Sequence, residues 1–135
     1  MKAELYAPKE YWRLKPEQIA SVTNGCGPGR FGSLIVPDKI FGTDIRVACN
    51  IHDWMYWLGE TIEDKHEADR VFLNNMLRLI DAHNGSWFVN IFRRRKALAY
   101  HQAVADFGGP AFWKGKNPIE NMKEVTHGQM VRTAH

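Results

Sequence analysis

The segment Ala48–Tyr56, ACNIHDWMY, places a histidine and an aspartate side by side where the spacing of apolar residues is helical. Counted from Ile45 at helical spacing, one stripe carries Ile45, Ala48, Cys49, His52 and Tyr56. Asp53 lies one turn after the cysteine, so two titratable groups lie toward the inward face. Burying a charge without a partner is costly, and such groups are usually paired, bound to metal or functional. His52 and Asp53 are therefore the first candidates for a site.

Helix signals predict a mainly α fold. A first helix is expected at about residues 8–22, interrupted or restarted at Pro16, because proline suits a helix start better than an interior. A glycine-rich loop follows Asn24, in which SLIV at 33–36 is a candidate short strand. The sequence thus begins with a short helical part and a long irregular connection.

Three longer helices are expected up to about residue 58, over about 63–83 and over about 87–107. Thr43 or Asp44 can cap the first of them, Gly59 ends it, and Ser86 can cap the last. Short connections favour antiparallel neighbours around one core. At 135 residues the chain is expected to form a single domain, 1–135, with a polar tail at 114–135.

The loop NGCGPGRFG is the second candidate feature. It has no Gly-Lys-Ser/Thr ending, so it is a poor match to a phosphate-binding P-loop. Closely spaced glycines let the backbone fold back and direct several carbonyls to one place, which suits Ca²⁺. Gly25, Gly27 and Gly29 could supply carbonyls, and Asp53 a carboxylate. A plain turn-rich connection is the alternative, and the pattern alone does not exclude it.

A third candidate is Asp69, at the edge of the apolar face of the 63–83 helix. If this helix is an antiparallel neighbour of the one before it, Asp69 could reach His52. A carboxylate that accepts from one ring nitrogen leaves the other nitrogen as a general base. The alternative is a charge near a helix N-terminus that favours the helix dipole and has no catalytic role.

Three motifs, in this order, resemble the phospholipase A2 superfamily: NGCGPGRFG, then ACNIHDWMY, then EADRVF. They match its glycine-rich calcium loop, its Cys-x-x-His-Asp-x-x-Tyr helix and its second helix bearing an aspartate. The resemblance covers about residues 24–76, within a motif-bearing core of about 24–83. It is greatest to the short, cysteine-poor members of bacteria and viruses. It implies a phospholipase A2-like fold, in which two long antiparallel helices carry the active site beside the calcium loop.

Roles for individual residues follow from the resemblance. It implies that Ca²⁺ is bound by the carbonyls of Gly25, Gly27 and Gly29 and by the carboxylate of Asp53. His52 would be the general base, Asp69 its orienting partner and Tyr56 a hydrogen-bonding support. Cys26 and Cys49 match two cysteines that are bonded to each other in the family, so they are candidate disulfide partners in an oxidising environment.

The implied reaction is calcium-dependent hydrolysis of the sn-2 ester of a glycerophospholipid at a membrane or micelle surface. The alternative is a catalytically inactive member used as a binding or structural module, in a viral particle or a bacterial effector. No signal peptide is visible, so we expect the chain to be made in the cytoplasm, with virion association or release as further alternatives. Neither the oligomeric state nor the lipid preference follows from the sequence.

Two other features carry alternatives. Cys26, Cys49, His52 and His66 could in principle form a Cys₂His₂ zinc site, although their spacing is irregular. The run Arg93–Lys96 is interpreted as a solvated helix face. The functional alternative is an electrostatic contact with anionic lipid headgroups. Nucleic acid is not expected as a partner, because no recognition motif or aromatic interleaving accompanies these charges. The five tryptophans are expected mainly in packing.

Overall fold

The computed structural model describes residues 3–22, 37–114 and 116 of the chain. Within these residues it contains six helices and one two-stranded hairpin. In chain order the elements are α1 (Lys9–Trp12), α2 (Pro16–Val22), β1 (Lys39–Ile40), β2 (Thr43–Asp44), α3 (Arg46–Leu58), α4 (Ile62–Ala82), α5 (Trp87–Phe107) and α6 (Gly109–Trp113). The prediction of a mainly α protein is confirmed for the described part of the chain.

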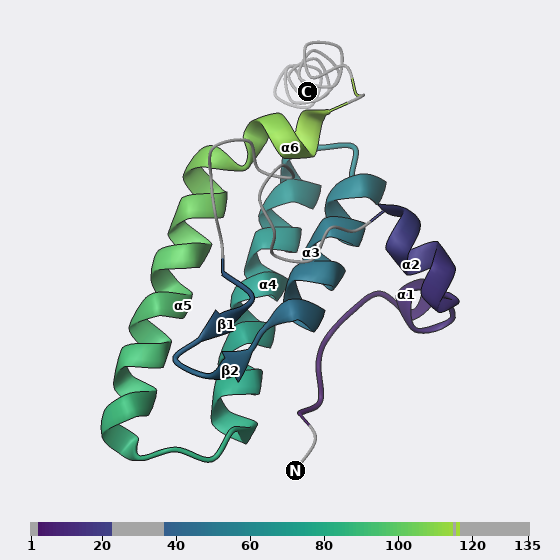
Figure 1. The fold of residues 1–135 in the computed structure, drawn as a ribbon. Coiled ribbons are helices and arrows are strands. Elements are labelled where there is room, and N and C mark those ends of the chain that lie inside the picture. The colour runs from purple at the N-terminus through teal and green to yellow at the C-terminus, as the bar shows by residue number, and fades with distance from the viewer. Residues whose placement is uncertain (1–2, 23–36, 115, 117–135) are drawn as a thin grey trace, which may run out of the picture.

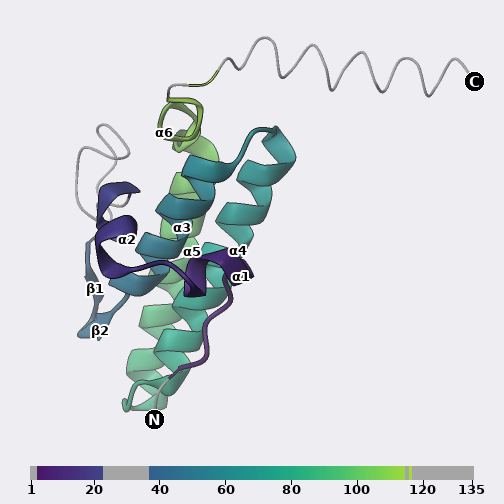
Figure 2. The same ribbon diagram turned by 90° about the vertical axis from the view of Figure 1, so that its right-hand side faces the viewer.

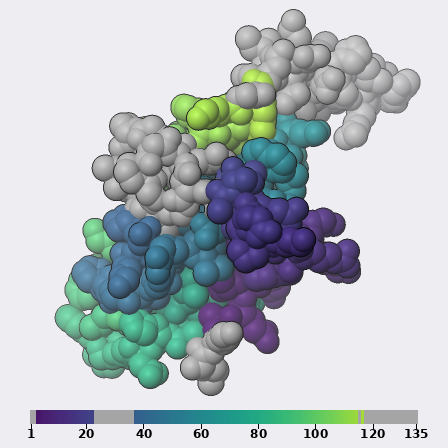
Figure 3. Space-filling view, turned by 45° about the vertical axis from the view of Figure 1, so that its right-hand side comes forward, coloured from purple at the N-terminus to yellow at the C-terminus, as the bar shows by residue number. Residues whose placement is uncertain are grey.

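The three long helices lie side by side and alternate in direction (Figure 1). Helix α4 packs against both α3 and α5. The connections at 59–61 and 83–86 are short, which forces each helix to run back along the one before it. In Figure 2, α1 and α2 lie in front of α3 while α5 lies behind, so the N-terminal helices and α5 lie on opposite sides of α3. The N-terminal segment, purple in Figure 3, forms part of the molecular surface on that side.

Side chains at the N-termini of α4 and α5 explain where these helices begin. Thr61 and Asp64 form a capping box, in which the Thr61 hydroxyl accepts from the Asp64 N–H at 3.2 Å and the Asp64 carboxylate accepts from the Thr61 N–H at 3.1 Å. The Ser86 hydroxyl accepts from the Val89 N–H at 3.2 Å, so the predicted Ser86 cap is confirmed. Both helices therefore begin at a residue that satisfies otherwise unpaired N–H groups.

The start of α3 differs from the prediction of a Thr43 or Asp44 cap. The N-cap residue is Ile45, which offers no capping side chain. Asp44 still satisfies a backbone N–H at the start of α3, because its carboxylate accepts from the Arg46 N–H at 2.9 Å. Thr43 instead belongs to β2 and makes a 2.6 Å hydrogen bond with Nδ1 of His83. Helix α3 ends at Leu58 as predicted, with Gly59 as its C-cap.

The hairpin β1–β2 is a short antiparallel pair that precedes α3. Its turn uses Phe41 at φ 44° and Gly42 at φ 86°, and the second of these left-handed conformations favours glycine. The sequence did not indicate this hairpin. The strand predicted at 33–36 lies outside the described residues.

The N-terminal region follows the expected break at Pro16, since α1 and α2 are separate helices and Pro16 begins the second. Tyr11 packs with Ile51 and Trp54 in a small cluster of its own. The Tyr11 and Trp54 rings meet edge to face with centroids 5.7 Å apart. This cluster fixes α1 against the face of α3 that lies away from the main core.

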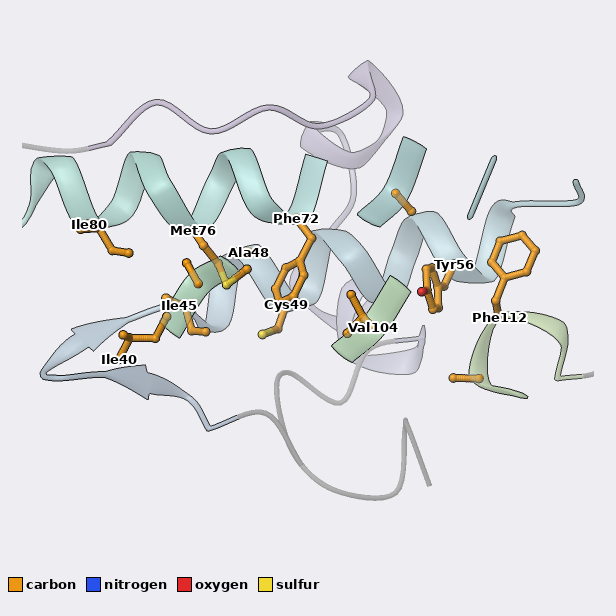
Figure 4. Close-up of a cluster of buried hydrophobic side chains, with 13 residues drawn as sticks. Ile40, Ile45, Ala48, Cys49, Tyr56, Phe72, Met76, Ile80, Val104 and Phe112 are labelled. Atoms are coloured by element: carbon orange, nitrogen blue, oxygen red, sulfur yellow. The ribbon is translucent and has the colours of Figure 1, made fainter. Parts of the chain in front are cut away.

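The main core fills the space between the three long helices and the hairpin (Figure 4). Its buried members are Ile40, Ile45, Ala48, Cys49, Tyr56, Ala68, Phe72, Met76, Ile80, Ala97, Val104, Ala111 and Phe112. Figure 4 shows Ile40 and Ile80 at one end of the cluster and Tyr56 beside Phe112 at the other. No helix of the described residues combines the length and apolar character needed to cross a membrane.

Two surface predictions need correction. Arg93 is buried, because its guanidinium donates to the Phe41 carbonyl at 2.8 and 3.1 Å, so the run 93–96 is only partly a solvated face. Trp12, Trp57 and Trp87 are exposed rather than packed, whereas Trp54 is buried.

Candidate active site

The inward stripe of α3 is buried as the sequence predicted. Its members are Ile45, Ala48, Cys49, His52 and Tyr56, each at most 2% exposed. Asp53, the neighbour of His52, is fully buried too. Helical geometry alone places His52 and Tyr56 one turn apart on the same face, so both point toward α4 together.

Asp69 of α4 joins this stripe. Nε2 of His52 lies 2.7 Å from Oδ1 of Asp69, and the Tyr56 hydroxyl donates to the same oxygen at 2.6 Å. Because α3 and α4 are antiparallel neighbours, residues 17 positions apart along the chain meet at hydrogen-bond distance. Asp69 is buried and makes these contacts, so it is not merely a surface charge at a helix N-terminus.

The hydrogen bonds define the chemical state of the pair. Burial by itself raises the pKa of Asp69, but hydrogen bonds from His52, Lys65 and Tyr56 and the interaction with a charged His52 hold this pKa below its usual value. An ionised carboxylate can only accept, so the proton of a neutral His52 ring lies on Nε2. The lone pair of the ring then lies on Nδ1, the nitrogen away from Asp69.

Aromatic packing holds the His52 ring in this orientation. The ring stacks on Phe72 of α4 with centroids 4.6 Å apart and an interplanar angle of 29°. The Tyr56 ring also contacts it, with centroids 4.1 Å apart. An imidazole in contact with two rings and hydrogen-bonded through Nε2 has little freedom to turn, as a positioned base requires.

Lys65 is part of the same cluster, although it was not among the residues predicted from the sequence. Its ammonium group donates to Oδ2 of Asp69 at 2.8 Å and to the carbonyls of Val104 and Ala105 at 3.1 and 3.2 Å. The i, i+4 spacing of Lys65 and Asp69 was the available signal. Lys65 therefore occupies the second oxygen of the carboxylate that orients His52, and it also satisfies carbonyls in the last turn of α5.

Asp53 lies on a different side of α3, close to α1. Burial and the charge of Asp53 both raise the pKa of Tyr11, so the phenol stays protonated beside this carboxylate. A buried carboxylate is a hard oxygen ligand of the kind that Ca²⁺ takes. In its chemistry Asp53 therefore fits the proposed metal.

The remaining predicted calcium ligands are three glycines of the loop. Gly25, Gly27 and Gly29 lie outside the described residues, so their carbonyls stay a prediction. Cys49 is disulfide-bonded. Cys26 also lies outside the described residues, so its pairing with Cys49 likewise stays a prediction. No protein-family model, curated protein or solved structure significantly matches the chain.

Gly108 approaches the cluster so closely that a larger residue will disturb it. A Cβ atom at Gly108 would lie 2.6 Å from the Tyr56 hydroxyl oxygen and 2.4 Å from the Val104 carbonyl oxygen, both far inside normal contact. We expect Gly108→Ala to lower the free energy of unfolding by about 1–3 kcal/mol, as overpacking does. Gly109→Ala is the matched control, because a Cβ there meets nothing within 4 Å. Urea denaturation of both variants checks this, and equal losses would contradict it.

Proposed function

We propose that the protein is a calcium-dependent esterase that hydrolyses the sn-2 ester of glycerophospholipids, with the phospholipase A2 mechanism. The observation that carries the proposal is the buried hydrogen-bonded set of His52, Asp69 and Tyr56, with Asp53 as the next residue after the histidine. A retired member of such a family would be expected to lose at least one of these groups. Here the base, its orienting acid and the candidate metal carboxylate are all present.

In this proposal His52 acts as the general base. Its Nδ1 takes a proton from a water molecule, directly or through a second water, and the resulting hydroxide attacks the ester carbonyl. Asp69 holds the ring through Nε2 and stabilises the imidazolium that forms. Tyr56 and Lys65 hold Asp69 by its two oxygens. The proton then passes from His52 to the leaving alkoxide, which restores the base.

Asp53 is assigned to the metal and not to proton transfer. Calcium, when bound there, would supply positive charge beside the substrate phosphate and the developing oxyanion. Asp53 would hold the ion with the carbonyls of Gly25, Gly27 and Gly29, as the resemblance implies. Its negative charge is needed for that task, so it cannot serve as the base as well.

The fold is proposed to be phospholipase A2-like, in a single domain with an origin in a bacterium or its virus. The antiparallel pair α3–α4, with His52 on one helix and Asp69 on the other, supports this assignment. The disulfide-bonded state of Cys49 favours it over a zinc site, because a disulfide sulfur is not the thiolate that zinc takes. His66, another of the candidate zinc ligands, is exposed on α4.

The test is fatty-acid release from mixed phospholipid micelles with Ca²⁺ and with chelator. Substrates labelled at the sn-1 or the sn-2 chain show which ester is cleaved. We expect release of the sn-2 chain that needs Ca²⁺. In the Asp53→Asn variant it should fall to the rate measured with chelator, because the buried carboxylate that holds the ion is lost.

Asp38→Asn is the control for that substitution, because Asp38 is exposed and should leave the rate unchanged. Calcium binding by the unmodified chain without any hydrolysis would instead support the inactive binding module. Chelator-resistant hydrolysis would contradict the metal role of Asp53 and leave the ester hydrolase in place.

A further inference from the structure

The outward side of α5 carries an exposed apolar surface that the proposed reaction does not use. Five large side chains there are between 42% and 75% exposed: Trp87, Phe88, Ile91, Phe92 and Leu98. We call these five residues the outer face of α5. Ring contacts join three of them, with centroids 5.8 Å apart for Trp87 and Phe88 and 5.2 Å apart for Phe88 and Phe92.

Helical geometry shows that this surface points away from the protein. The buried residues of α5 are Arg93, Ala97 and Val104, which form one stripe toward the rest of the molecule. At about 100° per residue, Trp87, Ile91 and Leu98 lie roughly 100–140° to one side of that stripe, Phe92 lies about 120° to the other side, and Phe88 lies almost opposite it. An apolar face of this kind, opposite the buried stripe, is uncommon on a surface without a partner.

The charge of the same helix selects the partner. Between Trp87 and Ala105 the sequence holds four basic residues, Arg93–Lys96, and no acidic residue. Arg93 is buried on the Phe41 carbonyl and Arg94 is paired with Asp81. Arg95 falls on the outward side between the aromatic residues, and both it and Lys96 are exposed. A surface that joins aromatic and aliphatic side chains to cations is complementary to an anionic phospholipid layer, where rings enter the headgroup region and cations meet phosphates.

A second copy of the chain fits this face less well. The basic residues lie near the middle of α5, so two copies that pair about a two-fold axis would bring their clusters together at the crossing. A nucleic-acid backbone would meet the cations, but it would leave Ile91 and Leu98 in water. Of these three occupants, an anionic lipid surface is the one that meets both the charge and the apolar area.

We infer that the outer face of α5 is the surface on which the protein docks to anionic membranes. The inference concerns attachment to a membrane and does not rest on the proposed function. Its contacts involve neither His52 nor Asp53. Docking can therefore be measured with chelator present, where the proposed hydrolysis is off.

The experiment is co-sedimentation of the full chain with vesicles in chelator, using phosphatidylcholine alone or mixed equally with phosphatidylglycerol. We expect binding to the mixed vesicles, much weaker binding to the neutral ones, and a blue shift of tryptophan fluorescence on binding. The Phe88→Ser substitution should weaken binding to the mixed vesicles about tenfold or more, as loss of one buried aromatic side chain predicts.

Phe107→Ser is the matched control, because Phe107 is on the same helix and is 67% exposed, compared with 57% for Phe88. It lies outside the outer face and should change binding less than about twofold. Equal losses in the two variants, or no vesicle binding, would overturn the inference. So would a dimer in sedimentation velocity that the Phe88→Ser variant abolishes, since a second copy would then occupy the face.

The outcomes separate the two proposals. Vesicle binding that needs Phe88, in a protein with no hydrolase activity, would keep the docking surface and remove the enzyme. Hydrolysis of dispersed short-chain phospholipid without vesicle binding would keep the enzyme and remove the docking surface.

Discussion

The His52→Ala variant is expected to hydrolyse phospholipid about 10²–10⁴-fold more slowly than the unmodified chain, which is the usual contribution of a positioned general base. His52 is the group whose tautomer and orientation Asp69 and the flanking rings fix, so its removal leaves the water without a positioned proton acceptor. The loss should appear in kcat, because the proposed role of His52 is proton transfer and not binding of the lipid.

His66→Ala is the matched control. His66 lies exposed on α4, three residues before Asp69, and should tolerate alanine with no change in rate. Steady-state kinetics on the same micelles provide kcat and KM for both variants, and circular dichroism shows whether each is folded. A folded His52→Ala protein that keeps its rate within about threefold would remove the general-base role, since such a change is far below the range for that role.

The long helices were predictable because each signal that sets them is local. Ser86 caps α5 through the N–H three residues ahead of it, and Gly59 follows the last helical residue of α3. The break at Pro16 is equally local, because it follows from the missing N–H of proline. Where such a residue stands at a helix end, the predicted and observed boundaries agree within a residue or two.

The hairpin β1–β2 and helix α6 were missed because they lack a local pattern. Each strand has only two residues, too few to show an alternation of apolar and polar side chains. Their positions depend on tertiary contacts, such as the hydrogen bonds from Arg93 to the Phe41 carbonyl. Because of this long-range contact, Arg93 is buried and not exposed as predicted.

Part of the site was predictable because local spacing along the helices sets it. His52 and Tyr56 share a stripe by helical spacing, and the short α3–α4 connection allowed Asp69 to be placed near them. Lys65 stands in the acidic stretch GETIEDKHEAD, which resembles a solvated first turn. Its burial depends on packing against the last turn of α5, where its ammonium group donates to two carbonyls. The spacing of residues within α4 does not reveal that contact.

Lys65→Met is expected to lower the free energy of unfolding by about 3–5 kcal/mol, the usual cost of removing one partner of a buried ion pair. Methionine keeps most of the volume of the lysine stem, so the main loss is the ammonium group. That loss removes the donor that Oδ2 of Asp69 shares with the Val104 and Ala105 carbonyls. Urea denaturation at neutral pH measures the difference.

A double-mutant cycle with Asp69→Asn separates the ion pair from other effects of the substitution. When Asp69 is already neutral, Lys65→Met should cost less, with a coupling of about 1–3 kcal/mol. Arg70→Met is the control, because Arg70 is exposed and its ion pair with Glu67 lies at the surface. Additive effects of Lys65→Met and Asp69→Asn would contradict a direct pair.

The pH dependence of this effect follows from the lowered pKa of Asp69. The unfolded chain binds a proton at Asp69 near its ordinary pKa of about 3.9, while the folded chain resists protonation until a lower pH. The contribution of Asp69 to stability is therefore fully present above about pH 4 and is lost as the pH falls through the folded pKa. The stability difference between the unmodified chain and Lys65→Met should accordingly be largest near neutral pH and shrink in acid, as Asp69 becomes protonated in both. A difference that stays constant down to the acid transition would show that Lys65 acts through the α5 carbonyls and not through Asp69.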